Sequence, residues 1–219
     1  LVAACLTQEE VVIENIPLIS DLLTMADIIQ ELGGNIKIKD HTISVKVEEF
    51  KKTKIALERA AEVRTSAMFM APLLARCGEA IIPNPGGCRI GARPIGRTID
   101  GLAQMGVEVI YKSSDGYFYM KAPNGLSGTD YTFKKSTHTG TETLILAAVF
   151  ARGETTLRNA AQEPEIEELV SLLNQMGAKI KKVDERTIKI EGVEELSGTT
   201  FRISPDRNEA VTLAIATIV

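Results

Sequence analysis

A cysteine between two arginines occupies a glycine-rich stretch, and these residue types together could do chemistry. From Pro83 to Gly106 the sequence reads PNPGGCRIGARPIGRTIDGLAQMG, in which Arg89 and Arg93 flank Cys88. Nearby cations favour the thiolate, which is the reactive form of cysteine. Cys88 is therefore predicted to be chemically active, the alternative being a small side chain that only fills a loop.

The same stretch continues into a predicted helix whose start could bind an anion. Pro94 suits the first helical position, where a missing N–H has no cost. The apolar residues beyond it recur at helical spacing, namely Ile95, Ile99, Leu102 and Met105. Arg93 and Arg97 would lie beside free amides, which favours a phosphate or carboxylate, although solvated arginines are the alternative.

A second helix start has the composition of an anion site. From His138 the sequence reads HTGTETLILAAV, in which Thr139 and Glu142 have the spacing of a capping box and Gly140 permits close approach to the backbone. Thr139 capping only its own helix is the alternative, because the glutamate opposes a bound phosphate. His138 could bond a ligand or lie exposed.

Two further arginines precede apolar helices. Arg64 lies in VRTSAMFMAP and Arg207 in SPDRNEA. A helix N-terminus favours anions over cations, so an arginine there calls for a partner. That partner is either a bound anion or one of the 29 acidic residues.

Composition places the chain among globular proteins and excludes several function classes. It has 219 residues, 44% of them hydrophobic, and a net charge of −4. That balance gives no overall attraction for nucleic acid or anionic lipid, and no apolar run approaches the length of a membrane helix. Cys5, Cys77 and Cys88 form no metal or disulfide pattern, so we expect no metal and a reducing cytoplasm. Cys5 and Cys77, in apolar segments, are expected to be inert core residues.

One block of sequence recurs three times with a period of about 70 residues. Each copy has an apolar helix, a short strand ending in asparagine, an amphipathic helix and a hairpin. The asparagines are Asn15, Asn84 and Asn159. The glycines expected to end the amphipathic helices in a left-handed conformation are Gly33, Gly106 and Gly177.

These repeats predict a pseudo-threefold α/β domain. Apolar helices cannot face water, so they are expected at the centre, with amphipathic helices and sheets outside them. We expect one domain over residues 1–203, with repeats at about 1–63, 64–135 and 136–203. Residues 204–219 resemble the start of a fourth unit and are expected to begin a second, truncated domain.

Four stretches resemble the enolpyruvyl transferases that act on UDP-N-acetylglucosamine. They are the cysteine loop, RTSAMFMAPLLAR upstream of it, and RNAAQEPEIEELVSLLNQMGAKI and PDRNEA downstream. The resemblance covers essentially the whole chain. It implies two domains, each a threefold repeat of βαβαββ units in an inside-out α/β barrel. It also implies transfer of an enolpyruvyl group from phosphoenolpyruvate to the 3-hydroxyl of UDP-N-acetylglucosamine, the committed step of peptidoglycan synthesis in the bacterial cytoplasm, without a cofactor.

The resemblance also implies roles for residues. Cys88 matches the cysteine that protonates the enolpyruvyl methylene and reacts with fosfomycin. Arg64 and Arg93 match arginines that hold anionic groups of the substrates. Pro94, Ile95, Gly96 and Arg97 match the stretch along the uridine, and Ser136, Thr137, His138 and Thr139 match the loop at the diphosphate. The second domain, which carries the aspartate base, is absent from this sequence.

The chain departs from the family pattern at several positions. Gly96, Arg97 and Thr98 stand where the family has an aspartate, an apolar residue and a histidine, and Ser136 stands where it has a lysine. Lys134, Lys135 or Arg97 would have to compensate for that lysine. These departures leave open a non-catalytic nucleotide-sugar-binding or regulatory paralogue. The related shikimate-pathway synthase, which has the same architecture without this cysteine loop, is a second alternative.

Overall fold

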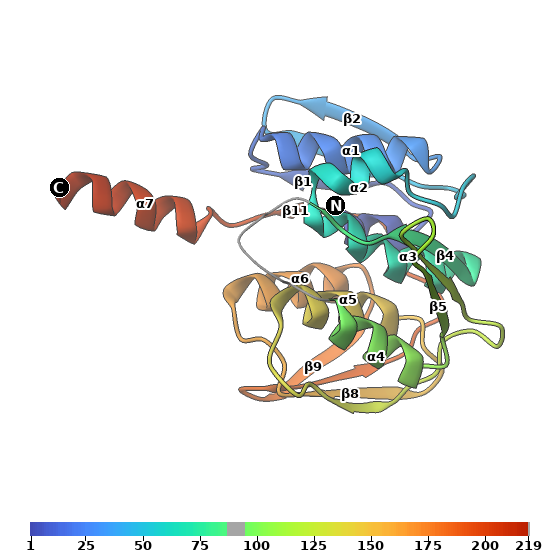
Figure 1. Cartoon of the computed structure of the whole chain (residues 1–219). Helices are drawn as coiled ribbons and strands as arrows, with labels where there is room; N and C mark the ends of the chain where they lie inside the picture. Colours follow the sequence, from blue (N-terminus) through green and yellow to red (C-terminus); the bar gives the residue numbers. More distant parts are fainter. Residues whose placement is uncertain (87–94, 219) are drawn as a thin grey trace.

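Three small sheets surround a group of buried helices in the computed structural model, which describes residues 1–86 and 95–218 (Figure 1). The first sheet has the strand order β11-β1-β3-β2. Its strands are β1 (Val11–Glu14), β2 (Asn35–Lys39), β3 (Thr42–Lys46) and β11 (Thr199–Arg202). The amphipathic helix of this unit is α1 (Ser20–Glu31), and the apolar segment that precedes β1 forms a short 3-10 helix, η1 (Val2–Leu6).

The second and third sheets repeat this arrangement. The second has the order β4-β6-β5, with β4 (Glu79–Pro83), β5 (Glu108–Lys112) and β6 (Tyr117–Lys121). The third has the order β7-β8-β10-β9, with β7 (Asp130–Thr132), β8 (Glu154–Arg158), β9 (Lys179–Asp184) and β10 (Thr187–Glu191). Their amphipathic helices are α4 (Gly96–Gln104) and α6 (Pro164–Gln175).

Buried apolar helices lie at the centre, as the sequence predicts. They are η1, η2 (Arg64–Phe69), α3 (Met70–Cys77) and α5 (His138–Ala148), and a short surface helix, α2 (Leu57–Glu62), precedes η2. From Leu144 to Val149 every residue of the third apolar segment is buried. Helix α3 packs against both η1 and α5, so the apolar segments of the three units share one core.

The three units are joined by parallel strand pairing that the sequence pattern did not reveal. In each sheet the strand that follows an apolar helix pairs in parallel with a segment from the end of the preceding unit. β7 pairs with β8, Lys54 pairs with Ile81 of β4, and β11 closes the ring by pairing with β1. Residues near the end of the domain therefore complete its first sheet.

The predicted glycine and asparagine positions have special backbone conformations. Gly33, Gly106 and Gly177 have φ angles of +110°, +90° and +107°, which confirms that they end the amphipathic helices in the left-handed region. Asn15 and Asn159 also have positive φ, and their side-chain amides donate to the carbonyls of Ile203 and Phe133 at 2.9 and 2.8 Å.

The second unit differs from the other two at its asparagine. Asn84 is not among the described residues with positive φ, and its backbone N–H donates to the carbonyl of Gly116 at 2.9 Å. The backbone conformation after β4 therefore differs from that after β1 and β8. This difference comes immediately before the cysteine loop.

The last helix, α7 (Arg207–Ile218), extends away from the rest of the molecule (Figure 1). Leu213 and Ile215 on it are 63% and 57% exposed. A helix that is apolar on all sides is normally buried, so α7 has the composition of a core helix without its surroundings. No helix within residues 1–86 and 95–218 is long and apolar enough to cross a membrane.

The prediction that Cys5 and Cys77 are core residues is correct for Cys5 and wrong for Cys77. Cys5 is completely buried within η1, as expected. Cys77 is exposed, so its assignment to the core was wrong. It is the last residue of α3, and the helix ends there because Gly78 adopts φ +72°, which leaves the side chain at the surface.

Candidate functional site

Three of the predicted site residues, Cys88, Arg93 and Pro94, lie outside the described residues, and so does Arg89. The structure describes both ends of the segment that contains them. At the first end, the backbone N–H of Gly86 donates to the carbonyl of Ala60 at 3.0 Å. A Cβ atom at Gly86 would lie 2.6 Å from the Cα of Ala61, so this approach to α2 requires glycine.

Arg64 is separated from α2 by Val63 alone and is the first residue of η2. It is half-buried, and η2 packs against α5 and β4. The first end of the cysteine segment and the predicted substrate arginine are therefore both attached to the junction between α2 and η2.

At the second end of the segment, the described chain resumes with the start of α4. Ile95 precedes the helix, and its carbonyl accepts from the N–H groups of Thr98 and Ile99 at 2.9 and 3.1 Å. The predicted contact residues Gly96 and Arg97 form the first turn, in which Gly96 is exposed and Arg97 half-buried. A Cβ atom at Gly96 would meet nothing within 4 Å among the described residues, so the backbone there is open to a ligand.

The N-terminus of α5 holds the second predicted loop, with one correction. Thr137, and not Thr139, is the N-cap: its Oγ1 accepts from the N–H of Gly140 at 3.4 Å. Glu142 therefore takes no part in a capping box. Ser136, Thr137, His138 and Thr139 are all half-buried at this helix end, and Gly140 is buried.

Glu142 instead faces His138, whose Nδ1 lies 3.4 Å from Oε2 of the glutamate. Burial raises the pKa of Glu142, and the neighbouring histidine opposes that rise. The side chain of Glu142 is only 16% exposed. A second carboxylate, that of Glu165, lies 3.7 Å from Nε2 of His138.

The fold brings the two predicted helix N-termini together. Helix α4 packs against α5, and a methyl group at Gly101 would overlap the side chain of Leu144. One turn earlier, a Cβ atom at Gly140 would lie 3.2 Å from Oγ1 of Thr98. The stretch expected along the uridine and the loop expected at the diphosphate are therefore neighbours. We call residues 95–98 together with residues 136–140 the paired N-termini.

The paired N-termini can bind an anion with groups that the fold already orients. Each helix start presents backbone N–H groups without an intrahelical acceptor, and the aligned peptide dipoles add partial positive charge. Arg97 contributes a guanidinium from the first turn of α4. Two helix starts side by side match two linked phosphates better than a single carboxylate.

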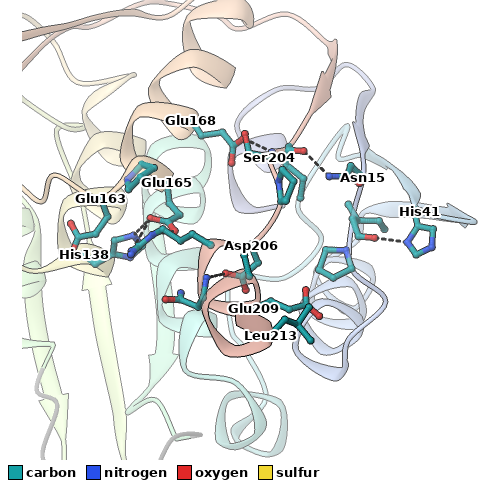
Figure 2. Close-up of a pocket in the computed structure, with 18 of the residues that line it drawn as sticks. Asn15, His41, His138, Glu163, Glu165, Glu168, Ser204, Asp206, Glu209 and Leu213 are labelled. Carbon is teal, nitrogen blue, oxygen red and sulfur yellow. Dashed lines mark hydrogen bonds and ion pairs between the residues drawn. The ribbon is translucent and has the colours of Figure 1, made fainter. Parts of the chain in front are cut away.

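A hollow of about 980 Å³ adjoins the N-terminus of α5 and lies between α5, α6, the start of α7 and residues 15–17 and 41 of the first unit (Figure 2). His138, Thr139 and Arg207 contribute to it, together with five carboxylates, those of Glu163, Glu165, Glu168, Asp206 and Glu209. So many negative charges disfavour a phosphate. The hollow does not have the electrostatics of a diphosphate site.

Arg207 is paired within the protein. Its Nε lies 2.9 Å from Oε1 of Glu165, and its terminal nitrogen lies 3.4 Å from Oε2. The salt bridge considered as the alternative to a bound anion is therefore the arrangement in this structure. Arg207 lowers the pKa of Glu165 in return. Figure 2 also shows the bond from Ser204 N–H to Glu168, which fixes the chain before α7.

Comparison with known proteins identifies the class. The chain belongs to the EPSP synthase (3-phosphoshikimate 1-carboxyvinyltransferase) family, whose sequence pattern matches residues 1–219. Among individual relatives, the UDP-N-acetylglucosamine 1-carboxyvinyltransferase of Solibacter usitatus is 42% identical over 216 residues, which cover 99% of this chain and 51% of that protein. The protein of the same name from Acidobacterium capsulatum is 42% identical over 220 residues, with coverages of 99% and 50%.

Solved structures confirm the predicted fold class. The enolpyruvyl transferase NikO from Streptomyces tendae matches with a TM-score of 0.85 at 22% identity, over 98% of this chain and 51% of that one. An EPSP synthase from Acinetobacter baumannii matches with a TM-score of 0.71 at 16% identity, over 95% and 48%. At these identities the likeness shows the fold alone. The chain spans about half the length of the curated relatives that it matches.

Proposed function

We propose that this chain is the cysteine-bearing domain of a UDP-N-acetylglucosamine 1-carboxyvinyltransferase. The reaction would move the enolpyruvyl group of phosphoenolpyruvate to the 3-hydroxyl of UDP-N-acetylglucosamine and release phosphate. The observation that carries the proposal is the contact between α4 and α5, which places residues 95–98 beside residues 136–140. The names of relatives at 42% identity support the same acceptor.

In this proposal the paired N-termini bind the nucleotide diphosphate. The backbone N–H groups of His138 and Thr139 would face one phosphate group, and Arg97 would supply the positive charge of the family's lysine, which Ser136 replaces here. Gly96 offers its backbone along the uridine. Arg64 and Arg93 hold the anionic groups of the reacting substrates, and Cys88 delivers a proton to the enolpyruvyl methylene.

The proposal includes a second domain. Residues 1–203 would form the domain described here, with repeats at about 1–63, 64–135 and 136–203, and residues 204–219 would begin the next one. The apolar surface of α7 supports this division, because Leu213 and Ile215 would become buried in a domain that continues beyond it. Catalysis would need both domains, since substrates must be enclosed and oriented between them. The step would serve peptidoglycan synthesis in the bacterial cytoplasm.

An acceptor assay tests the proposal. Full-length protein containing this chain is mixed with phosphoenolpyruvate and either UDP-N-acetylglucosamine or shikimate 3-phosphate, and phosphate release is followed. The expected result is release with the nucleotide sugar only, and its loss in Cys88→Ala. Release with shikimate 3-phosphate only would favour the family's other activity.

The same experiment examines the non-catalytic alternative, which the altered residues Gly96, Arg97 and Ser136 favour. A calorimetric titration with UDP-N-acetylglucosamine accompanies the assay. Binding without phosphate release would identify a nucleotide-sugar-binding paralogue. The isolated 219-residue chain is expected to bind the nucleotide sugar weakly and to release no phosphate.

A further inference from the structure

One buried tyrosine joins β7 to the first turn of α4. Tyr131 is 2% exposed, and its hydroxyl lies 2.9 Å from the carbonyl oxygen of Arg97 and 3.1 Å from Oδ2 of Asp100. A phenol has a single proton to donate, so the two acceptors share it. Both acceptors belong to α4, and one of them is the backbone of a residue in the paired N-termini.

The threefold repeat provides an internal comparison for this tyrosine. Tyr131 is paired with Leu157 of β8, and the equivalent parallel pair in the first sheet is Phe201 with Ile13. In the second sheet the same position, one residue after the bridge from Lys54 to Ile81, is Ile55. The three quasi-equivalent residues are therefore Ile55, Tyr131 and Phe201. A large apolar side chain satisfies the packing, so packing alone does not explain a hydroxyl at 131.

The surroundings of Tyr131 hold its hydroxyl in place as a donor. Phe133 contacts the tyrosine ring edge-on, with ring centroids 4.9 Å apart. Burial, together with the bond to Asp100, raises the pKa of Tyr131 to about 12. The hydroxyl therefore keeps its proton throughout the neutral range.

We propose that Tyr131 is a positioning residue for the nucleotide site: its hydroxyl ties the first turn of α4 to β7, and so holds Arg97 and Gly96 in place for the diphosphate and uridine. This rests on the proposed function for the identity of the ligand. The contacts between α4 and α5 at Gly101 and at Gly140 involve packing without a hydrogen bond to the first turn. Tyr131 supplies that bond.

The test compares Tyr131→Phe with wild type in the full-length protein. The variant keeps the ring and its contact with Phe133 and removes only the hydroxyl. Its folding is expected to survive, because the carbonyl of Arg97 retains its bond within the helix and Asp100 is exposed to water. The expected result is a rise of about fivefold in the KM and Kd for UDP-N-acetylglucosamine, with kcat and the KM for phosphoenolpyruvate nearly unchanged.

Tyr119→Phe is the matched control. It removes an exposed hydroxyl on β6 that donates to Asp115 at 2.7 Å and not to α4. The control is expected to leave both constants unchanged. In Tyr131→Phe, hydrogen exchange of amides 98–101 should accelerate relative to the rest of α4, and in Tyr119→Phe it should not.

Two results would overturn the proposal. One is wild-type affinity for the nucleotide sugar in Tyr131→Phe, and the other is an equal loss of affinity for both substrates with uniformly faster exchange, which marks a general loss of stability. Wild-type protein that binds no UDP-N-acetylglucosamine would reject the proposed function and with it the ligand named here. The exchange experiment would then still decide separately whether Tyr131 holds the helix.

Discussion

At the scale of single residues, the described cysteines are governed by their surroundings. Cys5 is enclosed by the core, and burial raises the pKa of its thiol to about 12. Desolvation also raises the pKa of Cys77, although its side chain reaches the surface. In both thiols desolvation outweighs the positive charge of Arg76, which acts in the opposite direction. Both are therefore expected to react slowly with electrophiles at neutral pH.

Cys5 gives a prediction about alkaline stability. The thiol titrates at about 12 in the folded protein and near 9.0 in the unfolded chain. Its contribution to the free energy of unfolding is therefore complete below pH 9 and lost as pH rises toward 12. Between about pH 8 and 10.5, the free energy of unfolding of wild type should fall by about 2 kcal/mol more than that of Cys5→Ala, as measured by urea denaturation. Equal losses of unfolding free energy in the two proteins would show that the titration of Cys5 does not contribute to the pH dependence.

Residues whose surroundings are set by their sequence neighbours were predictable, and residues with a distant partner were not. The burial of Cys5 follows from its apolar neighbours. Cys77 was misplaced because its exposure depends on where α3 stops, at Gly78. For Arg207 the sequence left open whether the partner is a bound anion or an acidic residue, because Glu165, with which it forms an ion pair, lies 42 residues away in the sequence. Tyr131 was missed, although aligning the repeats would have set it beside Ile55 and Phe201.

At the scale of elements, the contact between α4 and α5 is the feature on which the site depends. Gly101→Ala should push the helices apart, because its methyl group would overlap Leu144. Overpacking costs roughly 1–3 kcal/mol, of which the better helix propensity of alanine offsets about 1 kcal/mol. We therefore expect a net loss of about 1 kcal/mol in urea denaturation, with weaker binding of UDP-N-acetylglucosamine.

Gly96→Ala is the control for stability in the same helix. No described atom lies within 4 Å of the place that the new methyl group would occupy, so the substitution should leave the free energy of unfolding unchanged or slightly raised. Equal stability of Gly101→Ala and wild type would mean that α4 sits farther from α5 than described.

The helices and hairpins were predictable because each has its own periodicity and its own ending residue. The glycines that end α1, α4 and α6 are all in the predicted conformation. The cap of α5 was placed at Thr139 instead of Thr137 because several adjacent residues can all cap a helix. The parallel pairings were not predictable, because no local pattern records a partner as distant in sequence as β11 is from β1.

At the scale of the whole molecule, the exposed helix α7 leads to a prediction. Replacing Leu213 and Ile215 together by glutamine should leave the unfolding free energy of the isolated chain within about 0.5 kcal/mol of wild type, since both side chains are exposed. It should also reduce self-association in sedimentation. In the full-length protein the same two substitutions should lower the free energy of unfolding by about 3 kcal/mol or more, because the proposed second domain would bury the helix.

Val183→Gln is the control for this experiment, because Val183 is 58% exposed on β9 and belongs to the body of the domain. It should have little effect in either protein. Insensitivity of the full-length protein to the α7 substitutions would contradict the proposed division at residue 204.

The threefold architecture was predictable from three copies of one pattern, since buried apolar helices leave few alternatives to a shared core. The contact between two helix N-termini from different units was not, because it depends on how the units pack. The sequence therefore supplied both halves of the paired N-termini, and the fold supplied their proximity.

Mass-spectrometric mapping of the full-length protein after treatment with fosfomycin tests the proposal that Cys88 is the reactive thiol of an enolpyruvyl transferase. We expect an adduct on Cys88, with Cys5 and Cys77 unmodified at neutral pH. An adduct on Cys5 or Cys77 with Cys88 unmodified would contradict it.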